Sequence, residues 1–527
     1  MTELELRLSP ADAHDAAACR RAAAQKLGIS ETTISDFQIL RRSIDARGRD
    51  AVFQLRVAVF TEGASFSPEP ALLSQLQNVA EKPRVLIVGA GPAGYFAALE
   101  LIELGLKPII FDRGKDVRAR RRDLKAIQQQ GTVNPHSNYC FGEGGAGTYS
   151  DGKLYTRSHK RGSIEKSLRL FVEHGAKSDI LMDAHPHIGS NKLPQVVQNM
   201  RETIEHFGGE VHFDSFVTDF ILRACPDASG GSKILGITTN DATEHFGEAV
   251  ILATGHSARD IYYLLHKKGI KIEAKPFALG VRIEHPQTLV DAVQYKTPNR
   301  GALLPAASYS LVSQVNGRGV FSFCMCPGGL VVPASTAPGE IVVNGMSMSR
   351  RDSEYANSGT VVAIELEDLK SLGHHGVFAA LEFQKSVEQA MFAAGDGSQR
   401  APSQRLTDFV NRKISTNLPS TSYIPGLLSA PMHQILPPSV YNRLRGGVLE
   451  FGKMMKGYMT DEANVIGTES RTSAPVRIPR NAATLMHDDV EGFFPCGEGA
   501  GYAGGIISAA MDGQNVAKAV SKFLSEK

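Results

Sequence analysis

The sequence predicts an α/β fold: a Rossmann-like parallel sheet with a β-meander, interrupted by an inserted α+β domain and preceded by a small βαββ domain. Three segments predict the sheet, namely RVLIVGAGPAG at 84–94, EAVILATG at 248–255 and PCGEGAGYAGGI at 495–506. Each joins an apolar strand to a glycine-rich turn, and the first continues into a helix and a second strand. The third segment lies far beyond the second, so the C-terminal residues are expected to complete the sheet.

The chain of 527 residues is long enough for two or three domains. We expect an N-terminal module at 1–80, a discontinuous nucleotide-binding domain at 83–256 and 484–527, and an inserted substrate domain at 257–483. The inserted region is predicted from its irregular, strand-rich pattern, with candidate strands ALGVRIEHP, YSLVSQV, GVFSFCMC and EIVVNGMS.

Residues 1–80 predict the βαββ module. Leucines alternate at positions 4–8 as in a half-buried strand, and Ser9 then caps an alanine-rich helix. Two further strands are predicted at about 36–46 and 51–61. The module carries no catalytic constellation, so a packing or interaction role, with a protein as the partner, is favoured over a second active site.

The glycines of the first segment have separate physical roles. Gly89 permits a tight turn, Gly91 lets a pyrophosphate approach the backbone, and Gly94 lets the helix pack closely on the strand. The helix begins at Pro92 and Ala93, where unpaired N–H groups and the helix dipole favour a phosphate. The segment therefore predicts a dinucleotide site.

An acid at the end of the second strand supports this site. Asp112 follows the apolar strand at 108–111 and lies about twenty residues beyond Gly89, the spacing at which a carboxylate binds ribose hydroxyls. A glycine-rich turn in any α/β protein can imitate such a pattern. The two distant glycine segments make that alternative weaker here.

In their order along the chain, the three segments resemble the glutathione-reductase-like class of flavoproteins. The resemblance implies FAD rather than NAD as the resident ligand. It assigns the adenosine half to the first segment and to Ala253, Thr254 and Gly255. It assigns the ribityl chain and flavin to Gly497, Glu498, Gly504, Gly505 and Ile506. Glu498 stands where the class usually has Asp, whose carboxylate binds a ribityl hydroxyl.

A second glycine-rich stretch, at 139–154, is where flavoproteins of this class approach the isoalloxazine ring. Together, GEGGAGTYSDGKL, FSFCMCPGG, NGMS, GTESRTSAPVR and PCGEGAGYAGGI resemble a family of bacterial FAD-dependent dehydrogenases of undefined substrate. The resemblance implies the fold and the cofactor but no named reaction. Its remaining candidate cofactor contacts are Arg113, Gly144, Gly145, Gly147, Thr148, Ser150, Asp151, Lys153 and Val217.

Cys324 and Cys326 are the only paired thiols. They alternate on a predicted strand, so both face one side and suit a redox pair or metal ligands. The competing interpretation is stronger, because a CxC disulfide is strained and cysteine is a common buried residue. We expect no metal site.

The segment TESRTSAPVR precedes the return of the chain to the nucleotide-binding domain. Arg471 or Arg477 is a candidate for gripping a substrate carboxylate, and Glu469 for orienting that arginine or acting as a base. A buried salt bridge between domains is an equal competitor.

A basic cluster at 118–122 follows Asp112 on a predicted helix. It suits the FAD phosphates or the 2′-phosphate of transiently bound NADPH, although such a run is more often a solvated face. The net charge of +2 gives no case for nucleic acid as a partner. No apolar run is long enough to span a membrane, and the acidic start is unlike a signal peptide, so a cytoplasmic location is expected.

The sequence thus predicts an FAD-dependent oxidoreductase that acts on a small-molecule substrate, with NAD(P)H as a transient second ligand. A dehydrogenase or reductase is favoured. The alternatives are a flavin monooxygenase that uses NAD(P)H and oxygen, and a protein that uses FAD structurally as a binding or RNA-modification accessory.

Overall fold

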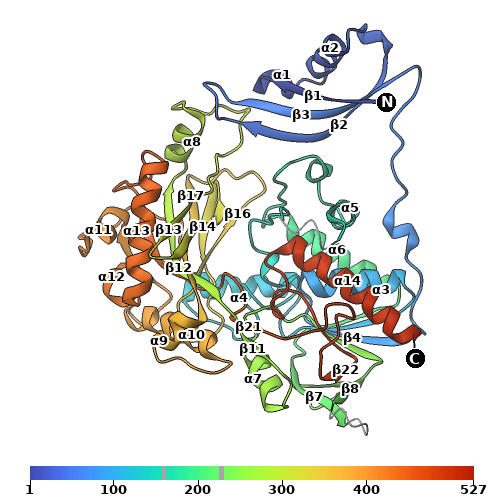
Figure 1. The fold of residues 1–527 in the computed structure, drawn as a ribbon, viewed down its shortest axis with the longest axis vertical. Helices are drawn as coiled ribbons and strands as arrows, with labels where there is room; N and C mark the ends of the chain where they lie inside the picture. The colour runs from blue at the N-terminus through green and yellow to red at the C-terminus, as the bar shows by residue number, and fades with distance from the viewer. Residues whose placement is uncertain (157–161, 225–230, 527) are drawn as a thin grey trace.

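The structure is a computed structural model, and it describes residues 1–156, 162–224 and 231–526. Figure 1 shows the N-terminal module at one end of the molecule, with a parallel sheet and a larger mixed sheet beyond it. This architecture confirms the predicted fold class. The proposed domain boundaries stay a prediction. In the described part of the chain, no helix combines the length and apolarity that crossing a bilayer requires.

The N-terminal module is an antiparallel sheet of order β1-β3-β2 with two helices packed on it. The predicted single helix is interrupted because the Asp15 side chain caps a second one, which ends at Gly28 in the left-handed conformation. The elements are β1 (Thr2–Leu8), α1 (Pro10–Ala13), α2 (Ala16–Leu27), β2 (Ile34–Asp45) and β3 (Val52–Thr61).

Strand β2 attaches this module to the rest of the protein. The Arg42 N–H donates to the Met182 carbonyl at 2.8 Å, and the Ala184 N–H donates to the Arg42 carbonyl at 2.9 Å. The Arg42 guanidinium also donates to Asp183 at 2.8 Å. A short strand-like contact therefore holds the module beside the loop at 182–184.

A five-stranded parallel sheet forms a second layer of the molecule. Val85 and Ile87 face a core formed with α3 and α14, whereas Leu86 and Val88 face a core formed with the meander. All four are buried, which explains why this strand is continuously apolar. In sheet order the strands are β23 (Phe493–Pro495), β10 (Ala249–Leu252), β4 (Arg84–Val88), β5 (Lys107–Phe111) and β6 (Glu210–His212).

Helices cover one face of this sheet and the meander covers the other. Figure 1 shows the C-terminal helix α14 beside α3, although the two are far apart in sequence. The helices on this face are α3 (Pro92–Glu103), α5 (Ile164–Glu173), α6 (Leu193–His206) and α14 (Ile506–Ser525). Helix α7 (Arg259–Lys267) packs instead in the core on the meander side. Helix α4 (Val117–Gln130) packs mainly in a separate core with Val332 and Val342. The meander strands are β7 (Val217–Ala224), β8 (Ser232–Thr239) and β9 (Glu244–Phe246), and β22 (Val490–Glu491) pairs with β8.

The chain between α7 and β22 contains a seven-stranded mixed sheet. Each of the four candidate strands proposed for this region is present: three lie in the mixed sheet, and the fourth, EIVVNGMS, lies in a separate pair. In sheet order the strands are β13 (Val312–Val315), β14 (Arg318–Cys326), β17 (Tyr355–Ile364), β12 (Phe277–Pro286), β20 (Asn464–Glu469), β18 (Ala401–Arg405) and β19 (Leu427–Ser429). Two short pairs accompany it: β15 (Gly329–Pro333) with β16 (Val343–Ser347), and β11 (Glu273–Ala274) with β21 (Val476–Arg477).

Six helices pack around the mixed sheet in the part of the chain that the structure describes. Figure 1 shows α13 with α11 and α12 along its outer side, where α13 packs on β13, β14 and β17. The helices are α8 (Gln287–Tyr295), α9 (Leu366–Ser371), α10 (Ala379–Ala393), α11 (Leu406–Asn411), α12 (Met432–Ile435) and α13 (Pro438–Met454). The opposite side, with β16, faces the parallel sheet (Figure 1).

Candidate functional site

A single continuous pocket runs from the β4–α3 turn to the mixed sheet and encloses about 1490 Å³ of empty space, part of which is open to solvent. It brings together residues that are hundreds of positions apart. The predicted site residues that line it are Gly89, Gly91, Pro92, Ala93, Asp112, Arg113, Gly145, Gly147, Ser150, Asp151, Lys153, Val217, Ala253, Thr254, Gly255, Cys324, Cys326, Arg471, Glu498, Gly504, Gly505 and Ile506.

The turn between β4 and α3 has the geometry that its glycines predicted. Gly89 has φ +110°, and a side chain there would overlap the Ala253 carbonyl. A side chain at Gly94 would overlap the Gly89 carbonyl, so Gly94 allows the helix to pack and does not line the pocket. At Gly91 the Cβ direction is open, with Gly145 Cα at 4.0 Å as its nearest neighbour. The pocket side of the turn therefore leaves room for a ligand.

Two helices present their N-termini to this pocket. Helix α3 starts after Gly91 and α14 starts after Gly505, and neither has a side-chain cap. A Cβ at Gly504 or Gly505 would meet nothing within 4 Å. The free N–H groups and the dipoles of both helices therefore favour an anionic or electron-rich ligand.

Asp112 joins the turn to the loop at 139–154. Its carboxylate accepts the N–H groups of Ala90 at 2.8 Å, Gly114 at 2.8 Å and Gly142 at 3.1 Å. The residue also lines the pocket, where its remaining lone pairs are available. Its predicted contact with a ribose stays a prediction, but the structure adds a positioning role that spacing alone does not reveal.

Arg120 corrects the interpretation of the basic cluster. It is fully buried and donates to the carbonyl groups of five loop residues, Asn138, Tyr139, Gly142, Glu143 and Gly145. It therefore holds the glycine-rich loop, and it does not line the pocket. The other three arginines of the cluster, at 118, 121 and 122, are exposed, as expected for a solvated face.

Three predicted flavin contacts lie behind the pocket wall. Thr148 donates to the Glu143 carbonyl at 2.8 Å, and a side chain at Gly144 would overlap Thr148. Gly497 has φ +72°, and a Cβ there would lie 2.8 Å from that of Ala93. None of the three lines the main pocket, but Gly144 and Thr148 line a small adjoining pocket that shares Gly91, Pro92, Gly147 and Ile506 with it. Their predicted contacts with the flavin stay a prediction.

The end of the pocket near the mixed sheet is polar. Asp151 binds Arg351, whose Nε donates at 3.1 Å, and lies 3.9 Å from Lys153 Nζ. Lys153 Nζ also donates to the Met325 carbonyl and lies 3.9 Å from Cys326 Sγ. Asp151 and Lys153, both predicted to contact the cofactor, therefore lie beside each other in the pocket.

Both cysteines line the pocket, but not through the regular alternation that was predicted, because the register with β17 shifts between Phe323 and Cys326 and Cys324 has φ +44°. Cys326 is buried, and its thiol donates to the Cys324 carbonyl at 3.3 Å. Cys324 is open to the pocket, yet loss of bulk water raises its pKa to about 11. In the described chain no third Cys, His, Asp or Glu completes a metal site with them.

Glu469 lies beneath the pocket and not in it. It is fully buried and accepts Arg282 Nη1 at 2.6 Å. Arg282 also donates to Asn357 at 2.7 Å and to the Cys324 carbonyl at 2.8 Å. Burial raises the pKa of Glu469, and Arg282 acts in the opposite direction. Glu469 does orient an arginine, but it is Arg282 rather than Arg471 or Arg477.

Arg471 supports the salt-bridge interpretation. Its Nε donates to Glu388 at 2.7 Å and its Nη2 lies 3.3 Å from Glu340, both buried. Arg259 binds the same two carboxylates from α7. Burial acts to raise the pKa of Glu388, but the two guanidinium groups lower it. Arg471 is therefore committed to a buried network, and Arg477 lies outside the pocket against the Tyr502 ring.

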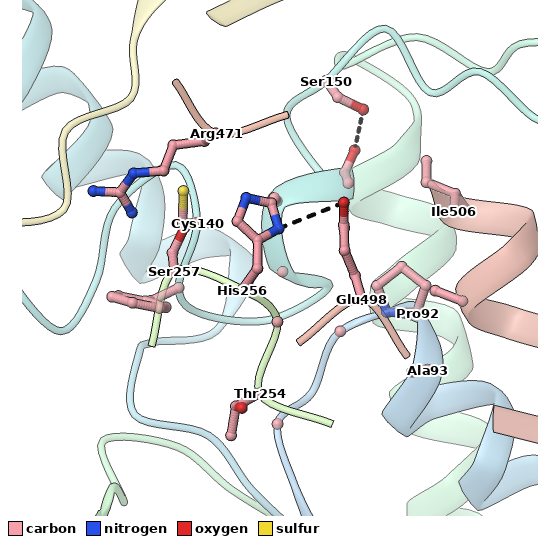
Figure 2. A pocket seen from close by; sticks show the side chains of 18 of the residues that line it. Pro92, Ala93, Cys140, Ser150, Thr254, His256, Ser257, Arg471, Glu498 and Ile506 are labelled. Carbon is pink, nitrogen blue, oxygen red and sulfur yellow. Dashed lines mark hydrogen bonds and ion pairs between the residues drawn. The ribbon is translucent and has the colours of Figure 1, made fainter. Parts of the chain in front are cut away.

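Sequence reasoning missed His256, which directly follows the ATG segment. Its ring lines the pocket, and Nδ1 lies 3.4 Å from Glu498 Oε1, as Figure 2 shows. It also missed Asn344 and Gly345 of β16, which line the end near the mixed sheet. The position of His256 after Gly255 was the available signal.

Comparison with known proteins supports one family. Residues 276–472 match the model described as "FAD-dependent protein, C-terminal domain-like", and residues 1–60 match a domain of unknown function, DUF8436. An uncharacterized protein of Clostridium beijerinckii is 40% identical over 525 residues, which is 95% of each chain. The chain belongs to the family of this protein. It is a family of FAD-dependent proteins, and the matched C-terminal model spans β12 to β20 of this member.

The chain is also remotely similar to solved structures of flavoproteins. A flavoprotein/dehydrogenase from Cytophaga hutchinsonii is 11% identical with a TM-score of 0.38, covering 84% of this chain and 79% of that one. The flavin-dependent brominase Bmp2 is 13% identical with a TM-score of 0.36, covering 85% and 80%.

Proposed function

We propose that this protein binds FAD non-covalently and acts as a dehydrogenase or reductase on a small molecule. The observation that carries the proposal is the single pocket that joins two uncapped helix N-termini to the polar end near the mixed sheet. FAD would supply the hydride or electron transfer, while the protein supplies binding, orientation and electrostatics.

The residues present fit such a dinucleotide. The open Cβ direction of Gly91 and the start of α3 suit a pyrophosphate. Asp112 suits the adenosine ribose, and the start of α14 at Ile506 suits an electron-rich part of the flavin. These assignments follow from the shape and donors of the wall.

The substrate would lie at the end near the mixed sheet. Lys153 and Asn344 offer polar groups there, and Phe323 offers an apolar surface. Such a mixture orients a small polar molecule. Arg471 would act on it only indirectly, because Glu388 and Glu340 occupy its donors.

The proposal is tested by anaerobic stopped-flow absorbance of the FAD-loaded protein mixed with NADH, NADPH or candidate small-molecule donors. Rapid loss of the oxidised-flavin band would support a dehydrogenase or reductase and identify its donor. Oxygen incorporation into a product would instead select the monooxygenase. Bound FAD that no donor reduces would select the structural use of FAD, and failure to bind FAD would refute the proposal.

A further inference from the structure

The ammonium group of Lys153 carries a positive charge at the end of the pocket near the mixed sheet. The side chain is 35% exposed and lines the pocket. Within the described chain its one ion-pair partner is Asp151, whose Oδ2 lies 3.9 Å from Nζ. Arg351 already binds that carboxylate through Nε at 3.1 Å and Nη2 at 2.5 Å. The charge of Lys153 is therefore accessible to a ligand of the pocket.

The other charges around this end of the pocket cancel in pairs. Arg351 neutralises Asp151, and Arg282 neutralises Glu469 at 2.6 Å. Lys153 therefore adds one positive charge in excess of these two ion pairs. A charge in a partly desolvated site is stabilised by an opposite charge, so a ligand bound there is expected to be negative.

Asn344 adds a neutral donor to the same end of the pocket. Its Oδ1 accepts the Gly345 N–H at 2.7 Å and lies 3.5 Å from Arg282 Nη1. These two donors identify the amide oxygen, so the remaining atom is the Nδ2 amino group. Within the described chain Nδ2 donates to no other residue, and the half-buried side chain lines the pocket. The amino group is therefore free to donate to a ligand.

Lys153 and Asn344 lie against one cluster of side chains. Cys326 Sγ is 3.9 Å from Lys153 Nζ and 3.7 Å from Arg282 Nη2. Arg282 Nη1 in turn is 3.5 Å from Asn344 Oδ1. An ammonium and an amide amino group only donate, so the ligand atoms that they bind must be acceptors. Phe323, on the same strand as Cys326, adds an apolar surface to the pocket wall.

We propose that this end of the pocket selects a substrate with a carboxylate on an apolar group, bound by Lys153 and Asn344. This inference rests on the proposed function and names its substrate class. A carboxylate carries one negative charge, which matches the single excess positive charge. A phosphate monoester carries nearly two at neutral pH. Lys153 is thereby assigned to the substrate and not to the cofactor, which the sequence resemblance had implied.

The test compares benzoate with benzamide, a neutral ligand of the same shape, by titration calorimetry of the FAD-loaded protein. The wild type is expected to bind benzoate at least about tenfold more tightly than benzamide, as a charged hydrogen bond implies. Lys153→Met is expected to abolish this preference, and Lys153→Arg to retain it. Asn344→Leu is expected to weaken both ligands by a similar factor, because the amino group donates to either carbonyl oxygen. Lys177→Met, at an exposed lysine outside the pocket, is the matched control.

Titration of FAD into the apo-proteins provides a second readout. The FAD affinity of each variant is expected to equal that of the wild type, which also shows that the variants fold. A wild type without preference for benzoate, a preference that survives Lys153→Met, or a loss of FAD affinity in Lys153→Met would each overturn the inference. FAD binding without the benzoate preference overturns the inference alone, whereas a wild type that binds no FAD refutes the proposed function and the inference with it.

Discussion

Arg282 and Glu469 form an ion pair of 2.6 Å between the neighbouring strands β12 and β20, and both side chains are at most 1% exposed. The guanidinium also holds Asn357 and the Cys324 carbonyl, so one buried charge connects the sheet to the wall of the pocket. Such a pair is expensive to break because either charge alone remains buried.

Glu469→Gln is therefore expected to lower the free energy of unfolding by about 3–5 kcal/mol. The measurement is urea denaturation at neutral pH. Arg477→Gln, at an exposed arginine, is the control and is expected to cost less than about 1 kcal/mol. A Glu469→Gln variant as stable as the control would contradict the importance of this pair.

Two substitutions of Gly91, to Ala and to Asp, test separately how the size and the charge of a side chain at the phosphate turn affect FAD binding. Gly91→Ala is expected to fold, since its Cβ would have no neighbour closer than 4.0 Å. Gly91→Asp is also expected to fold, but its affinity for FAD is expected to fall at least about a hundredfold, because a carboxylate would face the pyrophosphate. Titration of FAD into the two apo-proteins makes the comparison. Full retention of FAD by Gly91→Asp would refute this location for the phosphates.

Arg120 and Arg121 are neighbours on α4 with opposite environments, which makes them a matched pair. Arg120→Met removes the donors of five loop carbonyls and is expected to destabilise the protein by about 3 kcal/mol or more. It should also make the loop at 139–154 sensitive to protease. Arg121→Met, on the exposed face, should change neither property. Equal protease resistance of the two variants would argue against the role of Arg120.

The buried His285 is expected to make the free energy of unfolding depend on pH. It is fully buried, its Nε2 lies 2.8 Å from the Tyr458 carbonyl, and burial lowers its pKa to about 4. The unfolded chain gains a proton below about pH 6.5, so this group's contribution to stability falls by about 3 kcal/mol as the pH falls to about 4.

The measurement is urea denaturation of wild type and His285→Gln between pH 4.5 and 7. The variant should be less stable at pH 7 but should lose less stability on acidification. Parallel pH profiles for the two proteins would exclude His285 as a source of the dependence.

Local sequence was sufficient for the parallel sheet and its turn because their signals are local. The apolar run at 85–88 is buried on both faces, Gly89 has a positive φ of +110°, and Gly94 is required by its contact with the Gly89 carbonyl. The same reasoning predicted three strands of the mixed sheet, β12, β13 and β14, together with β16 and the strands of the N-terminal module, but not β17, β18, β19 or β20. These elements follow from backbone conformations and side-chain periodicity that neighbouring residues impose on one another.

Roles that depend on distant partners could not be predicted in this way. Arg120 and Arg121 are identical in type and adjacent in sequence, yet only one is buried among carbonyls. Glu469 and Arg471 looked like one functional group, but they bind different partners, Arg282 and Glu388. Because charged side chains interact through space, the identity of the residue alone does not determine its partner.

The sequence by itself determined the class of fold, the turn for a dinucleotide and the order of the segments around it. Only the tertiary structure decided which polar side chains face the pocket and which hold its wall. The physical reason is that burial and pairing depend on how the two sheets pack, as His256 and Glu498 show by meeting across 242 positions of sequence.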